Sequence, residues 1–280
     1  MSKVIIYHNN CYDGVTAAWV AYKALDLAFT GGVSDVEYVP CNYSDSPPDV
    51  TNKEVYIIDF SFKRPILKEM RARAKSLVIL DHHKTAEEAL KNFPGAIFDM
   101  NRSGAGMAWD YFFGQASRPD LVNYVEDRDL WRFKLPNSKE VNAFIQSWDI
   151  SLDTWIKEVV PRFYRFPLSA STIIPDEGES LLRIEQKYVK QICANAELKK
   201  VGEHVGPYVQ TSILMSEVCD YLIKNYPGNY PFAWYSFKRK DSRYQYGLRS
   251  RSDFDVSVIA KSFGGGGHKQ AAEFETTEEL

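Results

Sequence analysis

Short apolar stretches alternate with amphipathic stretches over the first hundred residues of the chain. The apolar stretches are rich in β-branched residues and span residues 3–8, 36–40, 54–59, 76–81 and 96–99. Continuous apolar runs of this length are typical of parallel strands that are buried on both faces. The stretches between and after them have helical spacing and predict helices over residues 14–27, 63–75, 85–92, 104–115 and 117–126. This alternation predicts an α/β domain with a parallel sheet and helices on both faces.

The pattern changes after about residue 130. Aromatic residues at helical spacing between 138 and 165 predict core-facing helices, and residues 176–200 read as one long charged helix. A second βα pattern then predicts strands over 208–213, 232–237 and 244–249 and helices over 216–225 and 255–262. We therefore expect a first domain over residues 1–175, a connecting helix over 176–200, and a smaller α/β domain over 201–280.

Charge and hydropathy narrow the class of protein. The net charge of −3 excludes a broad basic face, so any phosphate recognition must be local. No apolar run reaches the ~20 residues of a membrane helix, and the N-terminus leads directly into a strand, so we expect a cytoplasmic protein without membrane association. Four cysteines without a CxxC pair favour neither a structural zinc site nor a disulfide scaffold, and Cys41, Cys193 and Cys219 read as small buried hydrophobes.

Polar residues follow three of the predicted strands. His8 ends the first strand, Asp59 the third, and Asp81-His82-His83 the fourth. The carboxyl ends of neighbouring parallel strands open into one crevice, so these side chains should converge. Imidazoles with carboxylates favour manganese, iron or zinc, and a carboxylate between two histidine-bearing strands is the natural bridge for two ions. Each residue alone would more often be a cap or turn residue, but three such strand ends together favour a metal site.

A glycine run lies near the end of the chain. Gly264 to Gly267 are followed by His268 and Lys269, after an amphipathic helix. Such runs are often plain turns, but four glycines let backbone N–H groups approach a phosphate, and His268 adds a donor. Arg249 can supply a charge-assisted pair, so this region predicts a phosphate-binding site.

These two regions together resemble a known family. Asp81-His82-His83 after an apolar strand is the name-giving motif of the DHH phosphoesterases. Arg249-Ser250, followed by the run from Phe263 to Ala272, resembles the substrate-binding DHHA1 domain of that superfamily. The superfamily includes single-strand exonucleases, nanoRNases, cyclic-dinucleotide phosphodiesterases and family II inorganic pyrophosphatases. The resemblance spans nearly the whole chain and implies a DHH domain followed by a DHHA1 domain.

The resemblance also implies roles for single residues. It implies five metal ligands: His8, Asp13, Asp59, His82 and Asp127. Asp59 would bridge two ions, and Asp129 competes with Asp127 for the last position. His83 would face the substrate, and Asp81 would fix an imidazole tautomer. Independently of the resemblance, Arg128 is a candidate, with His83 and Arg249, for stabilising developing charge. The implied substrate-binding residues are Arg249, Ser250, Gly264, Gly265, Gly266, Gly267 and His268.

Cys11 departs from the family pattern. Many members have two aspartates in the first motif, and the first of that pair aligns with Cys11. Cysteine can ligate a soft ion as thiolate or remain inert. We favour an inert Cys11, because a hydrolytic site prefers hard ions and the neighbouring Asn9 and Asn10 offer oxygens that could hold a water. This leaves the position formed by Asp13, Asp59, His82 and Asp127 better supported than the other.

The expected activity is two-metal hydrolysis of phosphodiester bonds in short oligonucleotides or dinucleotides, in the cleft between the domains, as in an oligoribonuclease. Two Mn²⁺ ions are expected, with Mg²⁺, Co²⁺ or Zn²⁺ as other possibilities. One alternative is a hydrolase of another small phosphate ester: a cyclic nucleotide, a bisphosphate nucleotide or polyphosphate. A degenerate, non-catalytic nucleotide sensor is the other alternative, favoured only by Cys11. The sequence leaves the oligomeric state open, with a homodimer as one option.

Overall fold

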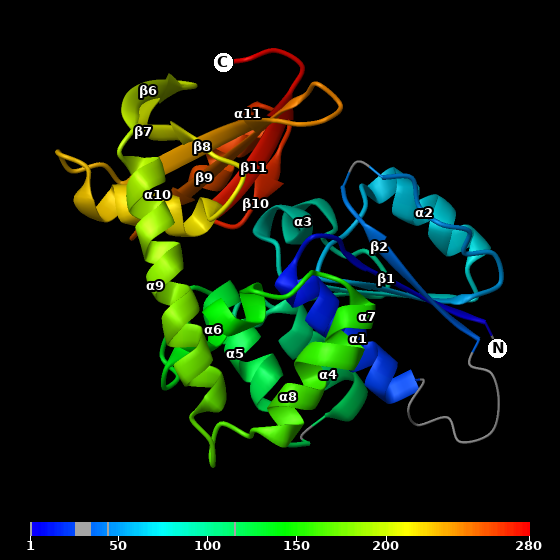
Figure 1. Cartoon of the computed structure of the whole chain (residues 1–280). Coiled ribbons are helices and arrows are strands. Elements are labelled where there is room, and N and C mark those ends of the chain that lie inside the picture. Colours follow the sequence, from blue (N-terminus) through cyan, green and yellow to red (C-terminus); the bar gives the residue numbers. More distant parts are fainter. Residues whose placement is uncertain (1, 26–34, 44, 115) are drawn as a thin grey trace. The chain divides into compact units, whose positions relative to one another are not determined.

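The computed structural model describes residues 2–25, 35–43, 45–114 and 116–280 (Figure 1). Two residues of the predicted helix 14–27 and the last residue of the predicted helix 104–115 lie outside the described residues. Within the described part, no helix combines the length and the apolar character that crossing a bilayer requires.

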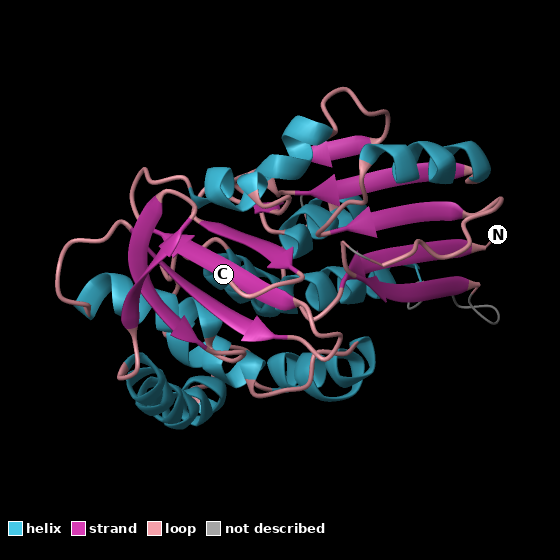
Figure 2. Cartoon of the chain, turned by 90° about the horizontal axis from the view of Figure 1, so that it is seen from above, coloured by secondary structure: helices cyan, strands magenta, loops and turns pink. Residues whose placement is uncertain are grey.

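The first sheet has five strands, all parallel, in the order β2-β1-β3-β4-β5. Figure 2 shows the strands in magenta with helices beside them. The bounds are β1 Lys3–His8, β2 Val36–Cys41, β3 Glu54–Ile58, β4 Ser76–Asp81 and β5 Ala96–Phe98. The five apolar runs of the sequence thus form the five strands, and the predicted α/β fold with a parallel sheet is confirmed.

Both faces of this sheet carry apolar side chains, because successive residues of a strand point to opposite sides and most residues of the strands are apolar. Ile5, Ile58 and Leu80 pack with α1 (Tyr12–Leu25) and α4 (Gly104–Phe113). On the other face, Ile6, Ile57 and Ile79 pack with α2 (Arg64–Arg73), and the short α3 (Lys84–Ala89) follows β4. Helices therefore cover both faces, as the sequence predicts.

The helices after α4 complete the core on the α1 side of the sheet. They are α5 (Asp120–Asp129), α6 (Ser138–Gln146), α7 (Leu152–Thr154), the π-helical turn η1 (Trp155–Val159) and α8 (Val160–Arg165). Trp155 is fully buried, and its ring N–H donates to Thr16 Oγ1 of α1 at 3.0 Å. Phe144 and Phe163 are also buried, whereas Tyr164 is exposed, so most of the aromatic stripe is core.

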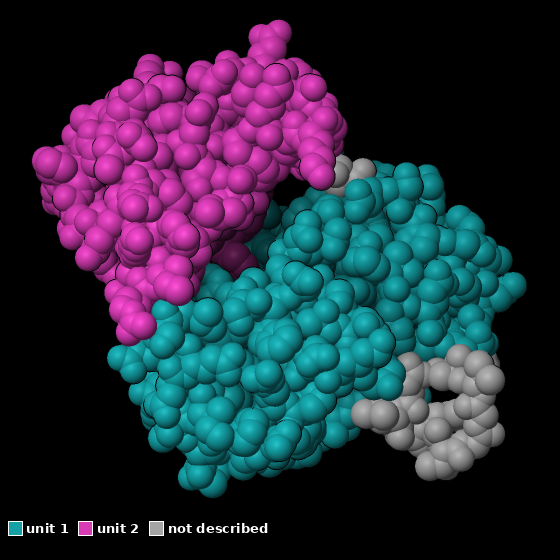
Figure 3. Space-filling model, viewed as in Figure 1, with its two compact units in different colours: residues 1–182 teal, residues 183–280 magenta. Residues whose placement is uncertain are grey.

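The chain divides into two compact units, residues 1–182 and 183–280, which Figure 3 colours separately. The boundary falls inside α9 (Ile173–Cys193), at the place where the sequence predicts a connecting helix. That helix ends earlier than the predicted residue 200. Residues Glu197–Val201 form strand β6 instead, and this strand is mostly exposed and rich in charged residues, as the helix before it is.

The second unit has a mixed sheet of six strands in the order β10-β11-β9-β8-β7-β6. Only the β7–β8 pair is parallel among the strand pairs of residues 183–280, all of which the structure describes. Apart from β6, the strands are β7 His204–Gln210, β8 Phe232–Lys238, β9 Tyr244–Ser250, β10 Gly266–Gly267 and β11 Ala271–Thr276. The helices α10 (Met215–Asn225) and α11 (Val256–Ser262) bury their apolar faces in two separate clusters, on opposite faces of this sheet.

Candidate metal centre

Three polar strand ends lie at one edge of the parallel sheet. His8 ends β1, Asp59 directly follows β3, and Asp81 ends β4. These three strands are neighbours, and their parallel register brings their carboxyl ends together. Asp59 takes a left-handed backbone conformation with φ of 67°, and its amide donates to Leu80 O at 2.9 Å. The convergence expected from the sequence is therefore present for these strand ends.

His82 lies among three carboxylates. Its Nε2 is 3.0 Å from Asp59 Oδ1, 3.7 Å from Asp13 Oδ2 and 3.7 Å from Asp129 Oδ2. The His82 side chain is only 2% exposed. An imidazole and three carboxylates at these separations form a donor set for a divalent ion.

Asp59 faces a different histidine with each oxygen. Oδ1 is hydrogen-bonded to His82, whereas Oδ2 lies 3.5 Å from His8 Nδ1. Oδ2 is buried and makes no hydrogen bond among the described residues. A buried carboxylate oxygen without a hydrogen bond is costly, and a cation beside it would remove that cost.

Two helix ends bring further groups to this edge. Asp13 lies in the first turn of α1, and the backbone amides of Gly104 and Ala105 at the start of α4 donate to its two oxygens. A Cβ atom at Gly14 would lie 2.3 Å from His8 O, and one at Gly104 would lie 2.5 Å from Asp59 Cβ. Glycine is required at both positions because the helix ends approach the strand ends so closely.

The donor atoms form two groups within the described residues of the first unit. One contains His8, Cys11 and Asp59, and the other contains Asp13, His82 and Asp129. Within each group the donor atoms lie within 4.8 Å of one another. Asp59 also contacts His82, so it belongs to both.

The charges of the cluster call for a cation. Burial, together with the charges of Asp59 and Asp129, raises the pKa of Asp13 well above its usual range. Burial also raises the pKa of Asp59, but the contacts with the His8 and His82 imidazoles outweigh it and hold that pKa well below its usual range. Burial alone would lower the pKa of His82, but Asp59 and the neighbouring acids raise it to about 10. A proton on His82 thus balances part of the negative charge, and a divalent ion would balance more of it.

Asp127 lies outside both groups. Its carboxylate accepts hydrogen bonds from the amides of Lys134 (3.0 Å) and Leu135 (3.2 Å) and from Ser138 Oγ (2.6 Å). These bonds hold the segment between α5 and α6. Side chains two residues apart on a helix point in directions that differ by about 200°. Asp129 therefore faces His82, and Asp127 faces away from it. Asp129, the competing choice in the sequence, therefore replaces Asp127 in the candidate ligand set.

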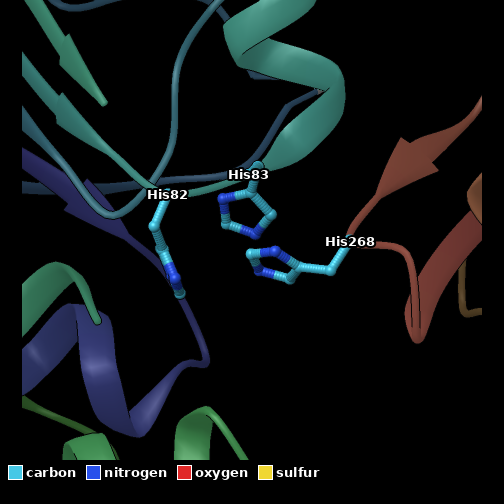
Figure 4. Close-up of side chains that lie close together, drawn as sticks. All are labelled: His82, His83 and His268. Atoms are coloured by element: carbon cyan, nitrogen blue, oxygen red, sulfur yellow. The ribbon is translucent and has the colours of Figure 1, made fainter. Parts of the chain in front are cut away.

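Asp81 holds His83 and does not enter either ligand group. Asp81 Oδ1 is 2.7 Å from His83 Nδ1 and accepts from the His83 amide at 3.0 Å, while Ser61 Oγ donates to Oδ2 at 2.6 Å. Figure 4 shows the His82 and His83 rings leaving the end of β4 in different directions. Arg128 lies next to Asp129 in sequence, and its guanidinium is 5.8 Å from the centroid of the Trp131 ring.

In the second unit, Arg249 is engaged with its own chain. Its Nε donates to Ser216 Oγ at 3.1 Å, and its Nη2 donates to Glu273 Oε1 at 3.2 Å. Tyr235 donates to the same Glu273 oxygen at 2.7 Å. The Ser250 hydroxyl donates to Phe254 O at 2.6 Å. A phosphate that binds Arg249 would therefore compete with Glu273.

The glycine run is an ordered part of the sheet. Gly266 and Gly267 form β10, and a Cβ at Gly265 would lie 2.1 Å from Glu273 O. The amides of Gly264, Gly265 and His268 donate to backbone carbonyls of the same unit. The prediction that backbone N–H groups of this run bind a phosphate is therefore wrong for these three amides, because each already donates a hydrogen bond within the fold. The His268 side chain remains a candidate donor in this segment.

Sequence reasoning missed the role of α4. Its N-terminus holds Asp13, and its first residue Gly104 packs against Asp59. The signal was present: Ser103 caps the helix by accepting from the Gly106 amide, and Gly104-Ala105-Gly106 are all small. Small residues directly after a cap indicate a helix end that approaches another group closely.

No family model matches the chain. The uncharacterized protein R106 of Acanthamoeba polyphaga mimivirus is 30% identical to it over 286 residues. The match covers 96% of this chain and 66% of the viral protein, so the chain spans slightly less than two thirds of that relative.

Solved structures of low identity share the fold. RecJ from Thermus thermophilus, in complex with Mn²⁺, is 12% identical with a TM-score of 0.52; the match covers 97% of this chain and 49% of RecJ. A structure described as the DHH domain of a member of a ribosomal protein family is 12% identical with a TM-score of 0.53, over 97% of this chain and 82% of that one. The chain thus shares its fold with these two structures, one of which is a DHH domain, and this similarity of fold agrees with the resemblance in its sequence.

Proposed function

We propose that the chain is a metal-dependent phosphoesterase that hydrolyses phosphodiester bonds in short oligonucleotides or dinucleotides. The observation that carries this proposal is the Asp59 carboxylate, which directs Oδ1 to His82 and Oδ2 to His8. One carboxylate between two groups of donors is the arrangement expected for a pair of ions.

The residues fit a pair of divalent ions. The donor set contains two imidazoles and three carboxylates, and one carboxylate oxygen is buried without a hydrogen bond. When bound, the ions would supply an activated water and charge neutralisation at the phosphoryl oxygens. Manganese is the first ion to test, since nitrogen and oxygen donors suit it and the RecJ structure contains it. Mg²⁺, Co²⁺ and Zn²⁺ are the other candidates.

Two side chains outside the ligand groups have proposed roles in the reaction. Asp81 fixes the His83 ring through Nδ1, which orients Nε2 for a hydrogen bond or a proton transfer to the substrate. Arg128 follows Asp127 and precedes Asp129, and its fixed positive charge would offset charge that develops on the phosphoryl group.

The second unit is proposed to bind the substrate beyond the reacting phosphate. His268 supplies a donor, and Arg249 and Ser250 can contribute if their present contacts with Glu273 and Phe254 are exchanged. The net charge of −3 supports a short substrate, because long nucleic acid requires a broad basic groove.

Of the two alternatives, a similarity of fold supports one. A structure described as an exopolyphosphatase-related protein from Bacteroides fragilis matches with a TM-score of 0.50 at 12% identity, over 100% of this chain and 88% of that one. This similarity of fold keeps polyphosphate and other small phosphate esters among the candidate substrates. A non-catalytic sensor is disfavoured, because Asp13, Asp59 and His82 all lie in the ligand groups.

A product-resolved screen with Mn²⁺ tests the proposal. Dinucleotides, oligonucleotides of increasing length, cyclic nucleotides, bisphosphate nucleotides, polyphosphate and a chromogenic phosphodiester would be incubated with the full chain and with Asp59→Asn as control. We expect hydrolysis of the short phosphodiesters by the wild type only. Turnover restricted to polyphosphate or a monoester would replace the proposed substrate class, and no turnover with any ion would favour the sensor.

A further inference from the structure

A thiol lies in the first of the two ligand groups. Cys11 Sγ, a ring nitrogen of His8 and a carboxylate oxygen of Asp59 all lie within 4.8 Å of one another. Donor atoms around one ion lie about 3–4 Å apart when the bonds to it are about 2.0–2.3 Å long. Small side-chain rotations therefore bring the three donors onto one ion.

The backbone fixes Cys11 in this place. Cys11 directly precedes α1, and its carbonyl accepts the first hydrogen bond of the helix, from the Val15 amide at 3.0 Å. Asn10 before it takes the left-handed conformation, with φ of 52°, which turns the chain from the end of β1 into the helix. The close approach of Gly14 to His8 O holds this turn against the strand. The thiol is thus presented by an ordered helix start.

Asp59 Oδ2 gives a second, independent indication of an ion at this position. The Asp59 side chain is 1% exposed, and Oδ2 makes no hydrogen bond among the described residues. His8 Nδ1 lies 3.5 Å from this oxygen. A cation held by His8 and Cys11 would lie beside this oxygen and compensate its burial.

We propose that His8, Cys11 and Asp59 form a thiolate-containing position that binds a zinc-class divalent ion. The position formed by Asp13, His82 and Asp129 with Asp59 has only nitrogen and oxygen donors and takes a harder ion such as Mn²⁺. The two positions of the proposed two-metal centre therefore differ in ion preference, and this proposal gives Cys11 a ligand role in place of the inert one expected from the sequence. On binding, the thiol sulfur forms a bond to the ion and its proton is released to solvent.

Cobalt titration of the metal-free full chain tests this directly. We expect the wild type to develop the near-ultraviolet sulfur-to-cobalt charge-transfer band, and Cys11→Ser to lose it while still binding Co²⁺ at the second position. Cys41→Ala is the matched control. Cys41 lies beside His8 in the sheet register but is buried in the apolar cluster with Val4 and Ile6, so this variant should keep the band.

Zinc binding provides a readout that does not depend on activity. We expect Cys11→Ser to weaken the binding of one zinc equivalent by more than about 10-fold, since even groups that only support a metal ligand contribute about 10–100-fold to affinity. Cys11→Asp should bind two ions but prefer Mn²⁺ over Zn²⁺ at this position. It serves as the second variant if the serine variant does not fold.

The outcomes separate this inference from the proposed function on which it rests. Two equivalents of Co²⁺ bound by the wild type without a sulfur band would overturn thiolate ligation and leave the two-metal centre standing. Wild-type protein that binds no Co²⁺ would overturn both. A band that survives in Cys11→Ser but disappears in Cys41→Ala would assign the sulfur to Cys41 and overturn the inference.

Discussion

The backbone amide of Gly104 donates a hydrogen bond to the Asp13 carboxylate. The Ala105 amide donates to the other oxygen at 3.0 Å, so the positive end of α4 holds a carboxylate of α1. A Cβ atom at Gly104 would lie 2.8 Å from Asp59 Oδ1 and 2.9 Å from Asp13 Oδ2. The start of α4 therefore positions two ligands of the candidate metal centre without supplying one.

We predict that Gly104→Ala displaces both carboxylates and loses at least one bound ion. Manganese affinity, measured by calorimetry, should fall by more than about 10-fold, the scale of a disturbed supporting contact. The control is Ala108→Gly on the same helix, because the Ala108 side chain is buried in the apolar cluster with Ile5 and Trp19. It should cost about 1 kcal/mol of stability through helix propensity and leave ion binding unchanged. Full ion binding by Gly104→Ala would show that α4 does not set the geometry.

Removal of the bridging charge should abolish the reaction. Asp59→Asn keeps the size of the side chain but removes the charge that faces both histidines, and His82→Ala removes the imidazole shared by three carboxylates. We expect both variants to fold, to lose metal and to lose hydrolysis of the chromogenic diester. Wild-type turnover by purified Asp59→Asn with Mn²⁺ would be incompatible with a two-metal centre.

We expect a substitution of Asp127 to lower the stability of the fold and a substitution of Asp129 to weaken metal binding. Asp127→Ala removes three hydrogen bonds from the segment between α5 and α6, and should lower the free energy of unfolding by roughly 2–4 kcal/mol. Asp129 lies at the exposed end of α5. Asp129→Asn should therefore leave the unfolding midpoint nearly unchanged, while it weakens metal binding because it removes a charge beside His82. Denaturant titration and metal titration of both variants would show the opposite assignment if Asp127 were the ligand.

The second unit should lose stability in acid through Asp220. Burial raises the pKa of Asp220, but its hydrogen bonds with Lys224 and Arg251 outweigh burial and lower that pKa. A lowered pKa in the folded state means that the stabilisation is complete above the unfolded value of about 3.9 and is lost as pH falls through the folded value. Asp220→Asn should therefore be less stable than the wild type at pH 7, with the difference shrinking as pH falls below about 4. A constant difference from pH 7 to the lowest pH at which both fold would refute this linkage.

His268 should govern substrate capture. We expect His268→Ala to raise KM for a dinucleotide by about 10-fold, the scale of one charge-assisted contact, with kcat little changed. Its activity on a small chromogenic ester should stay near that of the wild type. Arg249→Ala is a poorer test, because it also removes hydrogen bonds to Glu273 and Ser216 within the second unit. An equal loss on both substrates would instead place His268 at the reacting phosphate.

The sequence predicts the parallel sheet well because each strand is an uninterrupted apolar run. The candidate metal ligands that end such runs, His8 and Asp59, could be located from the sequence, because the carboxyl ends of neighbouring parallel strands converge. The sequence does not distinguish Asp127 from Asp129 as the candidate ligand, because both lie in the last turn of α5 and only packing decides which side of this helix faces His82. The preferences of ions alone favour an inert Cys11, whereas the place of Cys11 beside His8 depends on the turn at Asn10.

The second unit was predicted less completely. Strands β6 and β11 lie away from the centre of the sheet, and both contain several charged or polar residues, so they give weaker signals than the apolar β8. The glycine run predicts a flexible loop. In the structure, glycine is instead required at position 265, because Glu273 O leaves no room for a Cβ atom. Composition alone does not distinguish a loop that binds a ligand from a strand that packs closely.

The left-handed backbone of Asp59 limits what can ever replace it. Among residues with a side chain, aspartate and asparagine tolerate this conformation best, and branched side chains are excluded. An aspartate codon becomes an asparagine codon by one base change, and that change would remove the charge while keeping the turn. The fold can therefore outlive its proposed chemistry by a single mutational step, and Asp59 is the position at which this chain could lose its metal centre while keeping its backbone.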